Sequence, residues 1–333
     1  MMSHDKLLTI SIAAYNVAPY LSKTLSSLII DKNLDRLEVL IINDGSKDET
    51  SDIAEEFVKK YPQTFVLINK KNGGHGSTIN AGIENATGKY FKVLDGDDWL
   101  DPQGLEKLLY KLDKTNADLV LTDRVNVYET RKEYVRYGGK VLKETELLFS
   151  SLRNPIEITL SAISVNTGLL KKSGYKCLEN CFYEDLQFDS YAIAVSDSYI
   201  YCPIDLYQYR LGREGQSISP QNMQNNIHMS IKVAKAVDQF FCIHSKTLSY
   251  GQKLCIANRA VLIHTQVIST YMSFKTDKKY KKLLFDFISE IKSDEIKENI
   301  KKEKKYMKIL FDFPKTYEII SKLYKLIKRV KRL

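Results

Sequence analysis

The residue types best suited to chemistry gather in one stretch of this chain, KYFKVLDGDDWLDP at residues 89–102. An apolar, strand-like run ends there in four carboxylates within seven residues, those of Asp95, Asp97, Asp98 and Asp101. These carboxylates repel one another, and a divalent cation would offset the repulsion because Mg²⁺ and Mn²⁺ prefer oxygen ligands. Gly96 permits a turn tight enough for Asp95 and Asp97 to reach one ligand. The alternative is an acidic turn that only ends a strand, since Asp and Gly are ordinary turn residues.

Buried strands must position this turn, because apolar runs alternate with helical patterns through the first half of the chain. We expect strands at residues 7–14, 37–42, 65–69 and 90–94, with helices between them. This alternation predicts right-handed crossovers and an α/β fold with a largely parallel sheet flanked by helices. Ligands of such sheets bind beyond the carboxyl ends of the strands, so the residues that follow three of these strands should face one pocket. They are Tyr15, Asn16, Asp44, Asp95 and Asp97.

A glycine-rich loop, Gly73-Gly74-His75-Gly76, precedes a helix that we expect over residues 78–85. A loop of this kind at a helix N-terminus can cradle phosphate. It matches neither the dinucleotide fingerprint nor the P-loop, which argues against an NAD-dependent oxidoreductase. Gly74 and His75 are candidate ligand-binding residues, and for His75 a structural or supporting role stays open beside direct contact with substrate.

Two later stretches carry polar side chains that suit a phosphate-bearing ligand. Glu184 and Asp185 open a helix expected to run to about residue 195, where the helix dipole favours carboxylates. Simple capping is the alternative for this pair. Residues 207–217 form an aromatic and basic loop whose Arg210 and Arg213 are suited to binding phosphate.

Composition narrows the class of protein. The chain has 333 residues, of which 44% are hydrophobic and 27% charged, as in ordinary globular proteins. No apolar run reaches about 18 residues, so no transmembrane helix is expected, and the N-terminus lacks the features of a signal peptide. The five cysteines complete no zinc pattern, and reduced thiols in a cytoplasmic protein are the simpler account.

The alternation of strands and helices stops at about residue 220, which predicts a first domain over residues 1–220 and a helical region over 221–333. Much of the net charge of +9 lies on residues 315–333, with seven Lys and Arg against one Glu. The apolar side of the last helix is formed by Tyr317, Ile320, Leu323, Tyr324, Ile327 and Val330. This pattern is typical of a helix that lies on an anionic membrane surface. Packing or dimerisation is the alternative.

Four stretches together resemble the family 2 glycosyltransferases with the GT-A fold, in both order and spacing. They are SIAAYN at 11–16, IINDGSKDET at 41–50, NAGIENATGKYFKVLDGDDW at 80–99 and YEDLQF at 183–188. The resemblance covers about the first 220 residues. It implies a Rossmann-like GT-A domain, a nucleotide-sugar donor that we expect to be a UDP-sugar, bound Mn²⁺ or Mg²⁺, and inversion at the anomeric carbon. The QxxRW motif of processive synthases is absent, which favours transfer of one sugar at a time.

The resemblance also implies a role for each matched residue. The nucleotide pocket would be lined by Ala14, Tyr15, Asn16 and Asp44. The donor and its metal would be bound at the DxD motif by Asp95, Gly96, Asp97 and Asp98, with Asp97 and Asp95 as metal ligands. Asp185 would be the general base, assisted by Glu184, and Arg210 and Arg213 would clamp the diphosphate. The chain departs from the family pattern in its GGHGSTIN loop, where small residues and an arginine are commoner.

The sequence therefore predicts an inverting, metal-dependent glycosyltransferase of the hexosyltransferase type that builds a cell-surface polysaccharide or glycoconjugate. Its expected partners are the donor, a glycan, glycolipid or glycoprotein acceptor, and an anionic membrane surface, but no nucleic acid. Two alternatives stay open. A sugar nucleotidyltransferase would normally show a glycine-rich phosphate loop with a basic residue after the first strand, and a catalytically silent protein would only bind the nucleotide-sugar.

Overall fold

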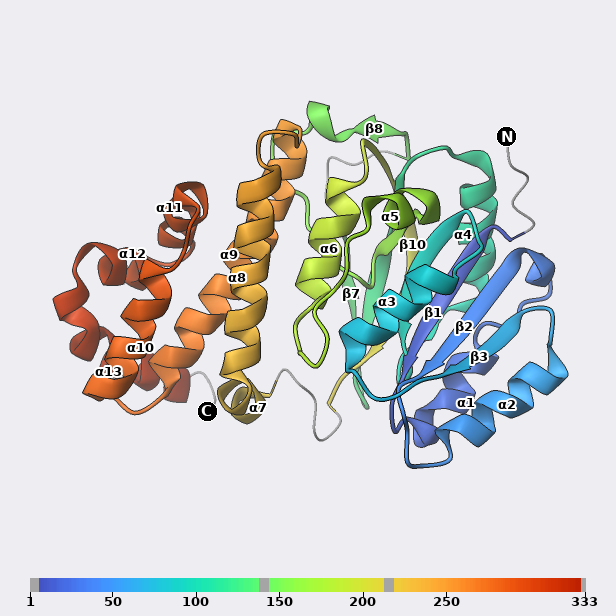
Figure 1. The fold of residues 1–333 in the computed structure, drawn as a ribbon, viewed down its shortest axis with the longest axis horizontal. Helices are drawn as coiled ribbons and strands as arrows, with labels where there is room; N and C mark the ends of the chain where they lie inside the picture. The colour runs from blue at the N-terminus through green and yellow to red at the C-terminus, as the bar shows by residue number, and fades with distance from the viewer. Residues whose placement is uncertain (1–5, 138–143, 213–218, 331–333) are drawn as a thin grey trace. The chain divides into compact units, whose positions relative to one another are not determined.

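The computed structural model describes residues 6–137, 144–212 and 219–330, the last three of these for the backbone alone (Figure 1). The chain forms two compact units. One comprises Met1–Arg213 with Ser249–Gln252, and the other comprises Glu214–Leu248 with Lys253–Leu333. Arg213, a candidate for binding the diphosphate, lies outside the described residues.

The first unit is built on one mixed sheet, which has ten strands within the described residues. Its main order is β3-β2-β1-β4-β9-β6-β10-β5, with β7 paired to β6 and β8 to β10. The strands are β1 Leu8–Ala14, β2 Leu37–Asn43, β3 Phe65–Asn69, β4 Tyr90–Asp95, β5 Trp99–Leu100, β6 Leu119–Val127, β7 Lys132–Val135, β8 Leu147–Leu148, β9 Ile163–Asn166 and β10 Ser198–Arg210.

The four strands expected from the apolar runs pair in parallel in the order β3-β2-β1-β4. Almost every residue of β1 and all residues of β2 are buried, as continuous apolar strands in a covered parallel sheet should be. The other half of the sheet is mixed. β9 runs antiparallel between β4 and β6, while β10 runs parallel to β6. The prediction of an α/β fold with a parallel sheet is therefore confirmed for the half that carries the acidic turn.

Six helices of this unit cover the sheet: α1 Ala18–Ser26, α2 Thr50–Lys60, α3 His75–Asn85, α4 Pro102–Lys114, α5 Thr167–Ser173 and α6 Asp185–Ala194. Leucines of α1 and α4 and Ala54 of α2 join the core on one face of the sheet. On the other face Phe188 of α6 packs edge-on against Phe91 of β4, with 6.2 Å between ring centroids. Figure 1 shows α3, α5 and α6 together on the near side of the sheet.

Three local predictions need correction. Helix α3 begins at His75 rather than at residue 78, so the histidine lies in its first turn. Residues 207–210 belong to β10 and not to a loop, because their backbone continues the pairing with β6. Asp101 caps α4, accepting a hydrogen bond of 2.7 Å from the Gly104 amide, so it serves the helix rather than the acidic turn.

The second unit is helical. Its helices are α7 Pro220–Asn225, α8 Ile227–His244, α9 Tyr250–Ser273, α10 Lys278–Ser289, α11 Asp294–Glu303, α12 Lys305–Asp312 and α13 Tyr317–Val330, and only the first three residues of α9 belong to the first unit. The buried Asp238 of α8 accepts hydrogen bonds from the amides of Lys292 and Ser293, at 2.7 and 3.2 Å, where α11 begins. Across the described residues, every helix is too short or too polar to span a lipid bilayer.

The last helix, α13, has two apolar faces rather than one. Tyr317 and Ile320 are buried, whereas the residues Ile319, Leu323, Leu326 and Ile327 are exposed. The prediction of a single apolar face was therefore wrong about which residues share a face. Spacings of three and four residues define both faces, and only packing decides which of them becomes buried.

Candidate active site

The carboxyl ends of the parallel strands bring the predicted pocket residues to one edge of the sheet. Ala14 of β1 is in register with Asn43 of β2, and Ala13 is in register with Asp95 of β4. Beyond β1 the chain turns through Asn16, whose φ of 51° is left-handed. The Asn16 side chain accepts a hydrogen bond of 2.8 Å from the Lys47 amide, and Tyr15 is half exposed. Ala14, Tyr15, Asn16 and Asp44 thus surround one strand edge.

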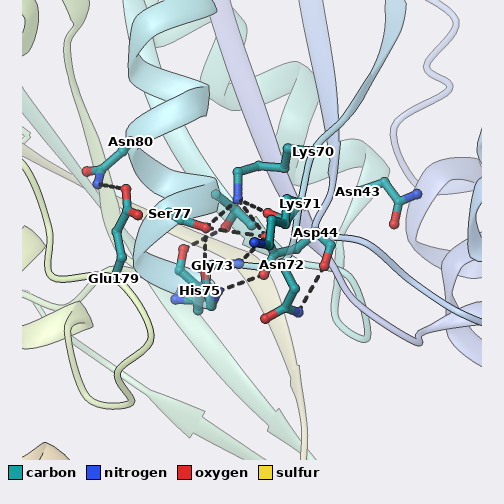
Figure 2. A network of polar contacts seen from close by, with 12 residues as sticks. Asn43, Asp44, Lys70, Lys71, Asn72, Gly73, His75, Ser77, Asn80 and Glu179 are labelled. Atoms are coloured by element: carbon teal, nitrogen blue, oxygen red, sulfur yellow. Dashed lines mark hydrogen bonds and ion pairs between the residues drawn. The ribbon is translucent and has the colours of Figure 1, made fainter.

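Asp44 is the centre of a buried polar network (Figure 2). It is only 2% exposed and accepts hydrogen bonds from Lys70 at 2.7 Å, from the Gly73 and Gly74 amides at 3.0 and 2.8 Å, and from Ser77 at 3.3 Å. Four donors occupy the usual acceptor capacity of a carboxylate. In this structure Asp44 therefore holds the glycine loop in place, in addition to any contact with a nucleotide base. The sequence analysis did not single out Lys70, whose position at the end of β3 was its only signal.

The glycine loop is fixed by close packing. Gly74 caps α3 with a φ of 81°, a conformation that favours glycine. A Cβ on Gly76 would stand 2.0 Å from the carbonyl oxygen of Leu178, so no larger residue fits. These two glycines allow the first turn of α3 to lie directly against residues 178–184.

His75 joins two acidic residues that are far apart in sequence. Its Nδ1 lies 2.5 Å from Glu184 Oε1, and its Nε2 lies 2.9 Å from Asp95 Oδ1. Burial acts to lower the pKa of His75, but the hydrogen bonds and charges of Asp95 and Glu184 outweigh it and hold the pKa well above its usual value. The second oxygen of Glu184, Oε2, is buried without a hydrogen-bond partner among the described residues. His75 is thus the main group that offsets the cost of burying the Glu184 carboxylate.

The acidic turn itself is partly buried and strongly negative. Asp97 and Asp98 are 8% and 1% exposed. Asp98 accepts a hydrogen bond of 2.9 Å from the Tyr207 hydroxyl and one of 2.7 Å from the Arg210 amide. Burial and the charges of Asp95 and Asp97 raise the pKa of Asp98 well above its usual value. Tyr207 was missed in the sequence analysis, because nothing in its local sequence indicates that it reaches the end of β4.

The donor set fits a hard divalent cation. The charges of Asp95 and Asp97 raise the pKa of Asp98, and a bound cation would reduce the repulsion among these carboxylates. Among the described residues no group of three or more His, Cys, Asp or Glu side chains forms a complete metal site. Asp95 and Asp97 would therefore supply part of a coordination shell and leave the remainder to oxygens of a ligand, as is usual where Mg²⁺ binds a phosphate-bearing substrate.

Asp185 differs from its neighbour Glu184 in environment. Glu184 is buried, whereas Asp185, the first residue of α6, is exposed as a residue. Its carboxylate is nevertheless partly removed from water by the surrounding protein, and this desolvation, with the charge of Glu184, raises the pKa of Asp185 to about 6. A carboxylate of this kind can accept a proton near neutral pH from a group that approaches through solvent.

The fold is that of the GT-A glycosyltransferases. The crystal structure of residues 1–349 of S. aureus TarS in complex with UDP-GlcNAc matches with a TM-score of 0.66, over 98% of this chain and 91% of that chain, at 19% identity. The mannosyltransferase PcManGT from Pyrobaculum calidifontis, in complex with GDP-Man and Mn²⁺, matches with a TM-score of 0.53, over 97% of this chain and 88% of that chain, at 14% identity.

Sequence comparison identifies the family. The model of glycosyl transferase family 2 matches residues 9–176, half of the chain, and the chain belongs to this family. The minor teichoic acid biosynthesis protein GgaB of Bacillus subtilis is 28% identical over 290 residues, which are 84% of this chain and 30% of that protein. The chain spans about a third of the length of curated relatives such as this one. The prediction that the chain resembles the family 2 glycosyltransferases is therefore confirmed at the level of the family.

His75→Ala should lower the free energy of unfolding of the first unit by about 2–4 kcal/mol, because it leaves Glu184 buried without its partner. Urea unfolding followed by the fluorescence of Trp99, the only tryptophan, measures this loss. Glu84→Ala, at an exposed position of the same helix, is the control and should change little. Adding Glu184→Gln to His75→Ala should restore part of the loss, and strictly additive losses would contradict the assignment.

Proposed function

We propose that this chain transfers one sugar from a nucleotide-sugar, with a UDP-sugar as donor, to an acceptor hydroxyl with inversion at the anomeric carbon. The observation that carries the proposal is the meeting of the acidic turn of β4 with the Glu184–Asp185 pair through His75. We infer from it a proton acceptor beside a site suited to a diphosphate and its cation. The name of GgaB supports an acceptor of the teichoic-acid type in cell-surface polysaccharide synthesis.

In this proposal the first unit is the catalytic domain, and each end of the donor has its own residues. Ala14, Tyr15, Asn16 and Asp44 line the nucleotide pocket, and Gly74 and Gly96 let the backbone approach the donor. Asp97 and Asp95 would hold Mn²⁺ or Mg²⁺, which would neutralise charge on the diphosphate. Asp98 and Arg210 stabilise this turn, since the Arg210 amide and side chain bond to Asp98 and to the Asp97 carbonyl. Arg213 is proposed from its sequence position alone.

Asp185 acts as the general base. The acceptor hydroxyl gives its proton to Asp185 as its oxygen forms a bond to the anomeric carbon. The bond from that carbon to the diphosphate breaks at the same time, and the nucleoside diphosphate leaves with the electron pair. Glu184 and His75 position Asp95 relative to Asp185, because the imidazole bonds to both Glu184 and Asp95. No covalent intermediate is required.

We further propose that α13 attaches the protein to the inner face of a membrane as a peripheral protein. Its exposed apolar residues Ile319, Leu323, Leu326 and Ile327 form a stripe at helical spacing. Lys322 and Lys325 stand within the same turns, and the sequence continues with Lys328 and Arg329. An apolar stripe flanked by cations fits an anionic lipid surface better than it fits water.

The donor and the metal are tested together by nucleoside-diphosphate release from UDP-, GDP- and TDP-sugars with Mn²⁺, with and without EDTA. We expect release from a UDP-sugar that EDTA abolishes and that Asp97→Asn lowers at least about 100-fold. Asp101→Asn is the matched control, because it changes a carboxylate of the same stretch that caps α4, and Asn is also a good cap. Metal-dependent joining of a sugar phosphate to a nucleoside triphosphate would favour the nucleotidyltransferase, and absence of both turnover and binding of UDP would reject the proposal.

The pH dependence of kcat/KM tests the general base. Asp185 must be deprotonated to accept a proton, so activity should fall about tenfold per pH unit below about pH 6 and level off above it. Asp185→Asn should lower kcat by about 10²–10⁴-fold, with much less effect on donor binding. An Asp185→Asn enzyme that keeps the wild-type rate and the same pH profile would exclude this role.

Membrane attachment is tested by cosedimentation with vesicles of phosphatidylcholine alone or mixed with phosphatidylglycerol. We expect binding to the anionic vesicles, reduced at least about tenfold by Leu326→Glu and by high salt. Ile243→Glu, at an exposed apolar residue of α8, is the control. If Leu326→Glu instead dissociates a dimer in sedimentation velocity without changing vesicle binding, the stripe is a protein interface.

A further inference from the structure

A group of cations and aromatic rings lies beside the acidic turn, and Arg210 is its one member with a role assigned above. Trp99 follows Asp98 directly and forms the short strand β5. The Lys23 Nζ of α1 lies 3.3 Å from the centroid of the Trp99 ring. The Arg210 guanidinium carbon lies 5.0 Å from the same ring and 4.9 Å from that of Tyr20. Two cations thus lie against the same indole ring.

The register of the sheet adds a third cation to this group. Arg210 of β10 is paired with Val127 of β6, and Val127 is paired with Lys132 of β7. Residues in register across neighbouring strands point to the same face of a sheet, so Arg210 and Lys132 extend on one side. Trp99 is paired with Gln208, two residues before Arg210, and therefore shares that side.

The two lysines of this group have no acidic partner among the described residues. Within the part of the chain that the structure describes, neither Lys23 nor Lys132 forms an ion pair, although both are exposed and several surface lysines elsewhere do. Burial, together with the nearby charges of Arg210 and Lys132, lowers the pKa of Lys23. Like charges held together in this way repel one another, and an anion that binds between them relieves the repulsion.

The position of this group relative to the acidic turn indicates which molecule would carry the anion. The Arg210 side chain donates to the Asp97 carbonyl at 2.9 Å, and its amide donates to Asp98 at 2.7 Å. The group therefore contacts the Asp97–Trp99 end of the DGDDW segment, whereas the glycine loop held by Asp44 meets the Asp95 end through His75. If the donor binds at the acidic turn as proposed, a molecule bound beside Arg210 would lie next to the donor sugar, where the acceptor must also lie.

We propose that Lys23, Lys132 and Arg210, arranged around Trp99, form an acceptor subsite for an anionic glycan that carries phosphate or carboxylate groups. The inference rests on the proposed glycosyl transfer and specifies its acceptor. The half-buried indole offers an apolar face to the carbon skeleton of a sugar or polyol, while the lysines and the guanidinium bind the acidic groups. Lys23 and Lys132 are binding residues and take no part in proton transfer.

The single tryptophan makes the subsite directly observable, because its fluorescence reports what binds beside it. With saturating UDP and Mn²⁺ present, the protein is titrated with poly(glycerol phosphate), with oligogalacturonate and with neutral dextran. We expect one of the two anionic polymers to change the fluorescence saturably and dextran to have no effect. Which polymer acts distinguishes phosphate from carboxylate recognition. Affinity should fall steeply with added salt.

Lys23→Gln and Lys132→Gln should each weaken this binding about five- to tenfold. They lie on α1 and β7, so one local disturbance cannot account for both, and circular dichroism checks that each variant is folded. Lys107→Gln, at an exposed lysine of α4, is the matched control and should bind as the wild type does.

Three results would overturn the subsite. They are equal binding of dextran, unchanged affinity in both variants, or absence of any polymer-induced change. In a parallel titration without UDP, a polymer-induced change that saturating UDP abolishes would assign the cations to the donor diphosphate instead. Donor turnover by the wild-type protein separates the two proposals, since metal-dependent release of UDP without polymer binding rejects only the acceptor subsite.

Discussion

The negative charge at the end of β4 is the constraint on which the rest of the site depends. Asp97 and Asp98 are buried, and a buried carboxylate that lacks partners costs several kcal/mol. The partners of this turn come from elements distant in sequence: His75 of α3 bonds to Asp95, and Tyr207 and Arg210 of β10 bond to Asp98. Because each lies on a different element, the acidic turn can keep its shape only if α3 and β10 are both in place. The turn therefore links the two halves of the sheet.

The glycine loop connects this constraint to the opposite edge of the pocket. Asp44 and Lys70 fix the loop, and the loop sets where α3 begins. Gly76 then allows the first turn of α3 to approach Leu178 so closely that His75 meets Glu184. A substitution of Asp44 would therefore shift the backbone that carries His75 and alter the surroundings of Glu184, although the two carboxylates are not in contact. Polar networks of this kind specify one geometry because each member depends on the others.

The sequence predicted those features that depend on local pattern. The four parallel strands follow from continuous apolar runs, and the convergence of Asn16, Asp44 and Asp95 follows from strand order. Contacts made by long-range pairing were not predictable. Nothing near Tyr207 indicates that its hydroxyl reaches Asp98, 109 positions away, or that β9 enters the sheet antiparallel. Asp101 shows the opposite error. Its spacing groups it with the carboxylates of the acidic turn, but its side chain accepts a hydrogen bond at the start of α4.

Glu184 and Asp185 show how one dipeptide provides two different carboxylates. Asp185 begins α6 and stays exposed, whereas Glu184 precedes the helix and turns inward to His75. Placing a charge on Glu184 raises the pKa of Asp185, and His75 moderates this effect by holding opposite charge near both. If His75 were absent, the buried charge would act on Asp185 without compensation and would shift its pKa further upward. The histidine in the unusual GGHGSTIN loop is thus the group that allows a buried and an exposed carboxylate to stand side by side, with the exposed one still able to ionise near neutral pH.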